Sequence, residues 1–231
     1  MTYKDAVLAT SGLVYYWRLN ESSGNAAPTV GGVTGSVFSA TRGVTGLLTR
    51  DTDTAFQFNG SSDYISFGNI GSFTGTNPFS LEVLIKQTAS GATSFPTILS
   101  KESGGDWSLY VDQSLGKFSF MRKTGAGTST YASGGTPATG SIFHLVATYD
   151  GSNQRLYVNG VLSATTANAG TAQTSTSSFQ LGRANTATDY FPGVIDEPAI
   201  YNVALSQATI TAHYNQVTNP TGGGGRSFIL W

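Results

Sequence analysis

Residues 142–162 of this 231-residue chain alternate between apolar and polar side chains and carry two turn signals. The stretch reads IFHLVATYDGSNQRLYVNGVL, with Asp150-Gly151 between its first two strand-like runs and Asn159-Gly160 before the third. Successive side chains of a strand point to opposite faces, and Asp-Gly and Asn-Gly are typical of tight hairpin turns. The pattern therefore predicts three antiparallel strands joined by two hairpins.

The same period-two pattern recurs along most of the chain. It is found in LVYYWRL, FSLEVLIKQ, and the pair WSLYVDQ and KFSFMRK, which flanks Leu115-Gly116 as a further predicted hairpin. AFQFNGSSDYISF, at 55–67, predicts another hairpin with Asn59-Gly60 opening its turn. Helical signals are confined to TYKDAVLA near the start and LSQATITAHYN, where Ser206 is the expected N-cap.

Many short strands with little helix favour an all-β fold, a two-sheet antiparallel jelly-roll sandwich with one or two short helices. We expect residues 1–216 to form this single domain. The formal net charge of -1 argues against nucleic acid as a partner, and the absence of Cys excludes disulfides and zinc-thiolate sites. The sequence shows no apolar run long enough to span a membrane and no secretory signal, so export would use another route.

The order of several segments resembles the laminin-G-like, concanavalin-A-like jelly-roll domains over about residues 12–216. These segments are AFQFNGSSDYISF, FSLEVLIK, FHLVATYDGSNQRLYVNGVL, LGR and FPGVIDEPAIYNVALSQATI. The opening YKDAVLATSGLVYYWRLNESSG also resembles the start of such domains in bacteriophage tail and surface proteins. The resemblance implies the fold, but the fold hosts lectins, glucanases, protein-binding modules and spacers, so function has to be argued from sites.

The motifs of common hydrolases are absent from the sequence. Glucanases of this fold present Glu-x-Asp-x-Glu on one strand, whereas Glu82 stands alone and the adjacent Asp196 and Glu197 are expected to point to opposite faces. The sequence has no Gly-x-Ser-x-Gly, His-Glu-x-x-His or P-loop. We expect no catalytic residues, and His144 is expected to be a hydrogen-bonded strand residue.

Two kinds of binding site are candidates. The resemblance implies a structural calcium near the chain ends, with Asn20, Glu21 and Asp196 as candidate ligands. Asp63, beside the predicted hairpin turn, is a second candidate position. The alternative is that Asp63 caps its turn and Asp196 accepts from buried backbone donors. For glycan binding, the aromatic candidates are Tyr131, Tyr190 and Phe191. Tyr190 and Phe191 are expected to be an exposed pair, with packing at the start of a strand as the alternative, and Trp107 is expected in the core.

From residue 217 the chain reads VTNPTGGGGRSFILW, a Gly-rich tether that ends in an apolar hook. The assembly residues of this tail would be Arg226, Phe228, Ile229, Leu230 and Trp231. Exposed apolar side chains of this kind favour docking on a neighbouring surface, by β-strand addition for example, or folding back onto the chain's own domain.

The tail, the fold and the lack of a secretion signal favour a non-enzymatic virion structural protein of a tailed bacteriophage. In this hypothesis the chain is a minor tail or capsid-decoration subunit on the virion surface. Its partners are other virion subunits or further copies of itself, with host-surface glycans as possible ligands. The alternative is a carbohydrate-binding module of a bacterial secreted or surface protein. A third hypothesis is a glucanase relative that has lost its catalytic carboxylates.

Overall fold

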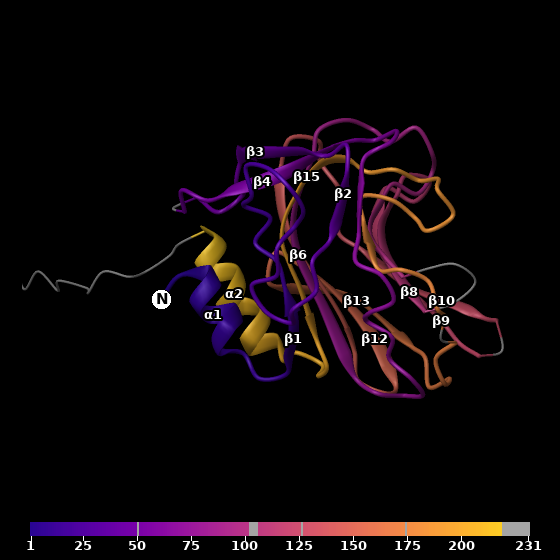
Figure 1. The fold of residues 1–231 in the computed structure, drawn as a ribbon. Helices are drawn as coiled ribbons and strands as arrows, with labels where there is room; N and C mark the ends of the chain where they lie inside the picture. The colour runs from indigo at the N-terminus through magenta and orange to yellow at the C-terminus, as the bar shows by residue number, and fades with distance from the viewer. Residues whose placement is uncertain (50, 102–105, 126, 174, 219–231) are drawn as a thin grey trace, which may run out of the picture.

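Two antiparallel β-sheets pack face to face in the computed structural model, which describes residues 1–49, 51–101, 106–125, 127–173 and 175–218 (Figure 1). Sheet A has the strand order β13-β12-β11-β6-β15-β4-β3, with β1 also paired to β15, and sheet B has the order β10-β9-β8-β7-β14-β5-β2. The expected jelly-roll sandwich with two short helices is therefore confirmed.

The longer strands lie in the predicted alternating segments, whereas β2, β3, β7, β10 and β14 are strands that the pattern did not indicate. In sheet A they are β1 (Leu13–Tyr16), β3 (Thr41–Thr45), β4 (Thr54–Asn59), β6 (Phe79–Gln87), β11 (Ile142–Tyr149), β12 (Asn153–Val158), β13 (Val161–Ala167) and β15 (Pro192–Tyr201). In sheet B they are β2 (Ser36–Phe38), β5 (Tyr64–Ser66), β7 (Thr97–Ser100), β8 (Trp107–Asp112), β9 (Lys117–Lys123), β10 (Ser129–Gly134) and β14 (Gln180–Leu181). The helices are α1 (Tyr3–Ala9) and α2 (Gln207–Thr218).

The main core lies between the two sheets and is filled by the inward-facing set of each strand. On β6 this set is Leu81, Val83 and Ile85, and on β8 it includes Trp107 and Leu109, all of them buried. Each such side chain contributes about 1.5–3 kcal/mol when it leaves water. Trp107 is a core residue, as the sequence predicts.

A second apolar layer lies on the outer face of sheet A, beneath the two helices. Figure 1 shows α1 and α2 side by side against this face, on the far side from sheet B. Val7 of α1 and Ile210 of α2 pack with Leu84 and Val146 of the sheet. Strand β15 lies in the middle of sheet A, between the main core and this second layer, and all ten of its residues are buried.

The hairpin predictions around residues 142–162 are confirmed in detail. Strands β11, β12 and β13 pair consecutively and antiparallel. Asn159 and Gly160 both have positive φ, 52° and 77°, which is the backbone that a type I′ turn requires. The Asp150 carboxylate accepts from the backbone N–H of Ser152 and Asn153 and closes the other turn. Strands β8 and β9 also form the predicted hairpin.

The predicted hairpin at 55–67 is wrong. Its first arm, β4, pairs with β3 and β15 in sheet A, whereas its second arm, β5, pairs with β2 and β14 in sheet B. The Asn59 side chain accepts the N–H groups of Ser61, Ser62 and Asp63, so the connection crosses between the layers instead of folding back. Phe58 and Ile65 still meet in the core, because they approach it from opposite sheets.

Helix α2 begins where the sequence predicts and continues beyond the expected domain boundary. The Ser206 hydroxyl accepts the N–H of Thr209 at 3.1 Å, which is the bond of an N-cap. The helix takes in Val217 and Thr218, and the Val217 side chain is buried. Residues 219–231, with the predicted assembly residues Arg226, Phe228, Ile229, Leu230 and Trp231, lie outside the described residues. Neither helix is long and apolar enough to cross a membrane in the part of the chain that is described.

Candidate functional site

A groove of about 200 Å³ opens on the outer face of sheet B. Its floor consists of residues that alternate with the core residues of β8, β9 and β10: Ser108 and Tyr110 flank Leu109, Met121 follows Phe120, and Ser129 and Tyr131 lie on β10. Period-two alternation places these side chains on the face that points away from the core. The helices lie on the opposite side of the molecule, against sheet A, so they do not cover this groove.

Two exposed aromatic side chains and one loop flank the floor of the groove. Phe95 is 44% exposed and Tyr131 is 50% exposed, and the Phe95 ring meets Tyr110 edge-on at 5.7 Å between centroids. Residues 184–189 contribute Ala184, Thr186 and Asp189. The groove thus combines exposed aromatic surface with hydroxyls and one carboxylate, which is the composition of a small polar-ligand site.

The predicted glycan residues are only partly in this groove. Tyr131 lines it, whereas Tyr190 is half-buried and receives a hydrogen bond from Arg183 at 3.3 Å. Phe191 is fully buried in the core, so the expectation of an exposed Tyr190–Phe191 pair is wrong for Phe191. Phe95 and Asp189 are absent from the predicted set. Both lie in loops, where apolar and polar residues do not alternate, so the sequence pattern does not indicate which way their side chains point.

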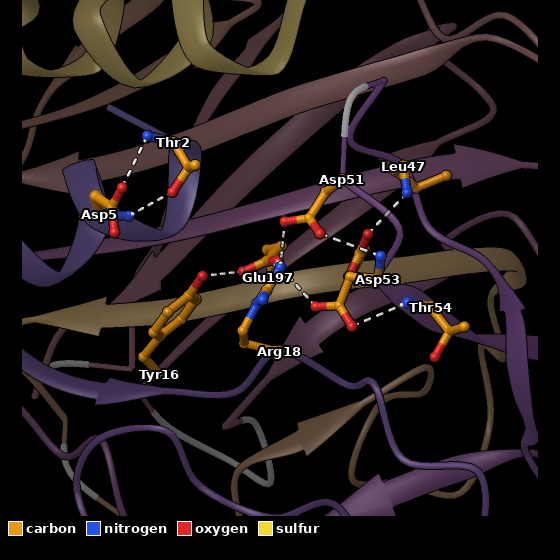
Figure 2. A network of polar contacts seen from close by, with 10 residues as sticks. Thr2, Asp5, Tyr16, Arg18, Leu47, Asp51, Asp53, Thr54 and Glu197 are labelled. Carbon is orange, nitrogen blue, oxygen red and sulfur yellow. Dashed lines mark hydrogen bonds and ion pairs between the residues drawn. The ribbon is translucent and has the colours of Figure 1, made fainter. Parts of the chain in front are cut away.

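The guanidinium of Arg18 is surrounded by carboxylates at one end of sheet A (Figure 2). Its Nη2 lies 2.7 Å from Asp51 Oδ2, 2.5 Å from Asp53 Oδ2 and 2.9 Å from Glu197 Oε1. The Tyr16 hydroxyl donates to the second oxygen of Glu197. Arg18 follows β1, Glu197 belongs to β15, and Asp51 and Asp53 precede β4, so the network ties the start of the chain to the centre of sheet A.

Asp196 and Glu197 do not follow the expected alternation. The register of β15 shifts between Asp196 and Ala199, and Glu197 adopts a φ of 54°, which marks a β-bulge. Burial raises the pKa of Asp196 well above its ordinary value, and the nearby Glu197 charge raises it further. Burial also raises the pKa of Glu197 to about 7, although Arg18 and Tyr16 oppose this. Both side chains are buried, so the pair presents no opening for a glycosidic bond.

The expected calcium ligands have other partners in the structure. Asp63 accepts from the Asn59 N–H and the Ser62 hydroxyl, and Asp196 accepts from the Leu47 N–H at 2.8 Å, as the alternative predicted. Glu21 accepts from Ala27, and Asn20 is exposed. Within the described residues no group of three or more His, Asp or Glu side chains is arranged to hold a metal ion. Asp63 and Asp196 thus have the hydrogen-bond partners that the alternative predicts, and Arg18 supplies the positive charge beside Glu197.

A second buried carboxylate, Glu82 of β6, lies between sheet A and the helices. It accepts from the hydroxyls of Tyr3 at 3.0 Å and Tyr201 at 2.6 Å. His144 Nε2 lies 2.6 Å from it, and His213 Nδ1 lies 2.9 Å from it. The sequence alone does not predict that these residues meet, because they come from five different elements and share no motif.

The charges of this cluster stabilise one another. Burial would raise the pKa of Glu82, but the His213 charge and the hydrogen bonds from both histidines hold it well below its ordinary value. Burial would lower the pKa of His213, but the Glu82 carboxylate raises it above its ordinary value. With Glu82 completely buried, the cluster joins the helices to the sheet and offers no surface to a ligand.

Comparison with known proteins places the chain in a family. The sequence matches the Concanavalin A-like lectin/glucanases superfamily over residues 59–211, more than half of the chain. The chain therefore belongs to this superfamily. No curated protein sequence matches it.

Three solved structures illustrate the fold likeness. The binding domain of Paraclostridial Mosquitocidal Protein 1 has a TM-score of 0.73 and 14% identity, over 94% of this chain and 54% of that one. The serotype D botulinum neurotoxin ligand binding domain, in complex with N-acetylneuraminic acid, has a TM-score of 0.68 and 15% identity, over 91% and 52%. Domain 4 of AbnA, a GH43 extracellular arabinanase from Geobacillus stearothermophilus in complex with arabinotriose, has 0.65 and 19%, over 87% and 98%.

These likenesses concern the fold, since the identities are low. The chain spans about half the length of the toxin binding domains, but nearly the whole of the arabinanase domain. All three structures are described as binding domains or in complex with a sugar.

Proposed function

We propose that this superfamily member is a non-catalytic carbohydrate-binding module, of the kind carried by bacterial secreted or surface proteins. The observation that carries the proposal is the sheet B groove, with Phe95 and Tyr131 exposed beside hydroxyls and the Asp189 carboxylate. A sugar ring has an apolar face of C–H groups and a rim of hydroxyls, so it is held by aromatic surface together with convergent polar groups. The groove offers both kinds of contact.

The groove is suited to a short contact with one end or one unit of a glycan. Its volume of about 200 Å³ is below the roughly 300–1,000 Å³ of pockets that enclose drug-sized ligands. Hydrolysis would need two carboxylates flanking the scissile bond, and Asp189 is the single carboxylate among the described lining residues. Binding without bond cleavage is therefore the function that this site supports best.

The first probes are sugars seen with structures of the same fold: arabinotriose, complexed with the arabinanase domain, and N-acetylneuraminic acid, complexed with the neurotoxin domain. A wider glycan array then gives the preferred ligand, and calorimetry gives its dissociation constant. We expect Tyr131→Ala and Phe95→Ala each to weaken that binding at least tenfold, or about 1.4 kcal/mol. Unchanged folding of the variants is checked by circular dichroism.

Phe38→Ala is the matched control. Phe38 is 43% exposed, almost the same as Phe95, and it also packs on a tyrosine, with its ring 4.3 Å from that of Tyr64. It lies on β2, at the other edge of sheet B from Tyr131 on β10. Binding that survives Phe38→Ala and is lost in Tyr131→Ala supports the groove. Absence of binding across the array, or equal losses in all three variants, would refute it.

The virion hypothesis is a separate proposal about the tail. It is supported by the sequence of residues 217–231 and by the resemblance of the opening segment to phage surface proteins, and it places the chain on the virion surface among other subunits. Light scattering of the full chain and of a deletion of residues 221–231 tests it. Oligomers or particle attachment that depend on those residues support an assembly role; monomers in both cases contradict it.

A further inference from the structure

The charge of the groove sets the class of sugar that it accepts. Asp189 is the only charged side chain among the ten described residues that line it; the others are apolar, aromatic or hydroxyl-bearing. We propose, on the basis of the proposed glycan-binding function, that the groove selects uncharged sugar residues and rejects those with a carboxylate, such as sialic and uronic acids, with Asp189 as the selecting residue.

Asp189 is held in place before any ligand arrives. Its carbonyl accepts the N–H of Thr97 on β7 at 2.8 Å, and its carboxylate accepts from the Thr188 hydroxyl at 3.1 Å. Its φ of 56° and that of Ala187, 58°, lie in the left-handed region, which is uncommon for residues other than glycine. Such conformations persist where the surroundings fix them, so the loop presents this carboxylate in a set position.

A fixed carboxylate has opposite effects on the two classes of sugar. Toward a neutral sugar it is an acceptor for one or two hydroxyls, and hydrogen bonds to a charged acceptor are the stronger kind. Toward a carboxylated sugar it is a like charge at close range in a partly enclosed site, where repulsion is less screened than in water. Repulsion of the wrong ligand and attraction of the right one together give specificity.

No basic side chain lines the groove to offset this charge, within the described residues. The nearest basic residue along the chain before Asp189 is Arg183, whose guanidinium lies 3.3 Å from the centroid of the Tyr64 ring. Its Nε donates to Gln180 and its Nη1 to Tyr190. Arg183 is therefore not among the residues that line the groove, and its guanidinium is engaged by Tyr64, Gln180 and Tyr190.

The experiment compares pairs of oligosaccharides that share a core and differ by one carboxylate-bearing sugar residue, lactose and 3′-sialyllactose being the prototype. The core of each pair is taken from the neutral glycans that the wild-type protein binds on the array. Dissociation constants are measured for wild type and for Asp189→Asn, because asparagine is nearly isosteric and also tolerates the left-handed backbone. Asp150→Asn is the control: it removes the same charge from an exposed turn of sheet A.

We expect wild type to bind the neutral member at least tenfold more tightly, and the ratio to shrink as salt rises. Asp189→Asn should weaken binding of the neutral sugar about threefold or more and bring the ratio near one, and Asp150→Asn should leave the ratio unchanged. The proposal is overturned if the carboxylated sugar binds wild type as well or better, or if the ratio survives Asp189→Asn. If no sugar of either class binds, the proposed function itself fails, and the selectivity fails with it.

Discussion

Replacing Glu82 by glutamine tests whether the buried cluster beneath the helices depends on a charged carboxylate. Four side chains point hydrogen-bonding groups at Glu82: the hydroxyls of Tyr3 and Tyr201 and the rings of His144 and His213. Glutamine has nearly the same shape, so the substitution leaves no cavity. It replaces an acceptor oxygen by an NH₂ group, which then lies opposite groups that also donate hydrogen bonds. It also removes the negative charge that pairs with His213.

The expected loss is large on the scale of the whole fold. Removing one member of a buried ion pair costs about 3–5 kcal/mol, because the partner charge and its donors are left uncompensated. A domain of this size loses about 2–4 °C in melting temperature per kcal/mol, so the midpoint should fall by roughly 6–20 °C. The total unfolding free energy of a domain is only about 5–15 kcal/mol.

Thermal and urea unfolding, followed by circular dichroism near pH 6, measure this loss. Glu21→Gln is the control with the same chemical change, because Glu21 is only partly buried and uses one oxygen to accept from Ala27, as glutamine also can. A loss below about 1 kcal/mol in Glu82→Gln, equal to that of the control, would show that the cluster does not need the carboxylate charge.

Three further predictions concern charge and backbone. The free energy of unfolding should fall as pH rises from about 5 to 8. The raised pKa of His213 gives stability that is fully present below the ordinary value of 6.5 and is lost as pH rises through the raised value. Glu197 has a pKa of about 7 in the folded protein against an ordinary 4.5, so its contribution is likewise lost as pH rises through 7. Urea titrations at several pH values check this. Glu197→Gln should reduce the total loss of unfolding free energy between pH 5 and 8 by roughly 2–4 kcal/mol. Arg18→Met should cost about 3–5 kcal/mol at pH 8 and less at pH 5, below the pKa of about 7 of Glu197, where that carboxylate is protonated. EDTA should leave the wild-type midpoint unchanged and added calcium should not raise it; a calcium-dependent rise would instead favour the ligands expected from sequence. Gly160→Ala should lose about 1–2 kcal/mol in urea unfolding, because φ is 77° and the new Cβ would lie 3.0 Å from Tyr214, and a neutral result would contradict this reading of the turn.

Local patterns predicted the parts of the fold that depend on local chemistry. Asn159-Gly160 specifies a type I′ turn by its own backbone preference, and the strands on either side carry the matching alternation. Ser206 caps α2 through a bond to a residue three positions away. In each case the deciding interaction lies within a few residues, so the sequence contains the whole signal.

The predictions failed where the partner is distant in sequence. Alternation shows which residues of 55–67 face the core but not which sheet each arm joins, and the carboxamide of Asn59 turns the chain across the sandwich. The bulge at Glu197 moves its carboxylate toward Arg18, 179 residues earlier. Glu82 and His213 meet only after α2 docks. Nothing in one sequence reveals such pairings before the fold is known.

The two outer faces of the sandwich differ in what they can be used for. On sheet A, the helices cover the outer face of the central strands, and the buried carboxylates Glu82, Asp196 and Glu197 affect the free energy of unfolding. On sheet B, the outer residues of β8 to β10 remain beside an open groove. Substitutions under the helices should therefore change unfolding free energy at constant ligand preference, whereas groove substitutions such as Tyr131→Ala should change binding at constant stability. This separation follows from the position of two short helices, because they cover sheet A and leave the sheet B groove, the proposed binding site, uncovered.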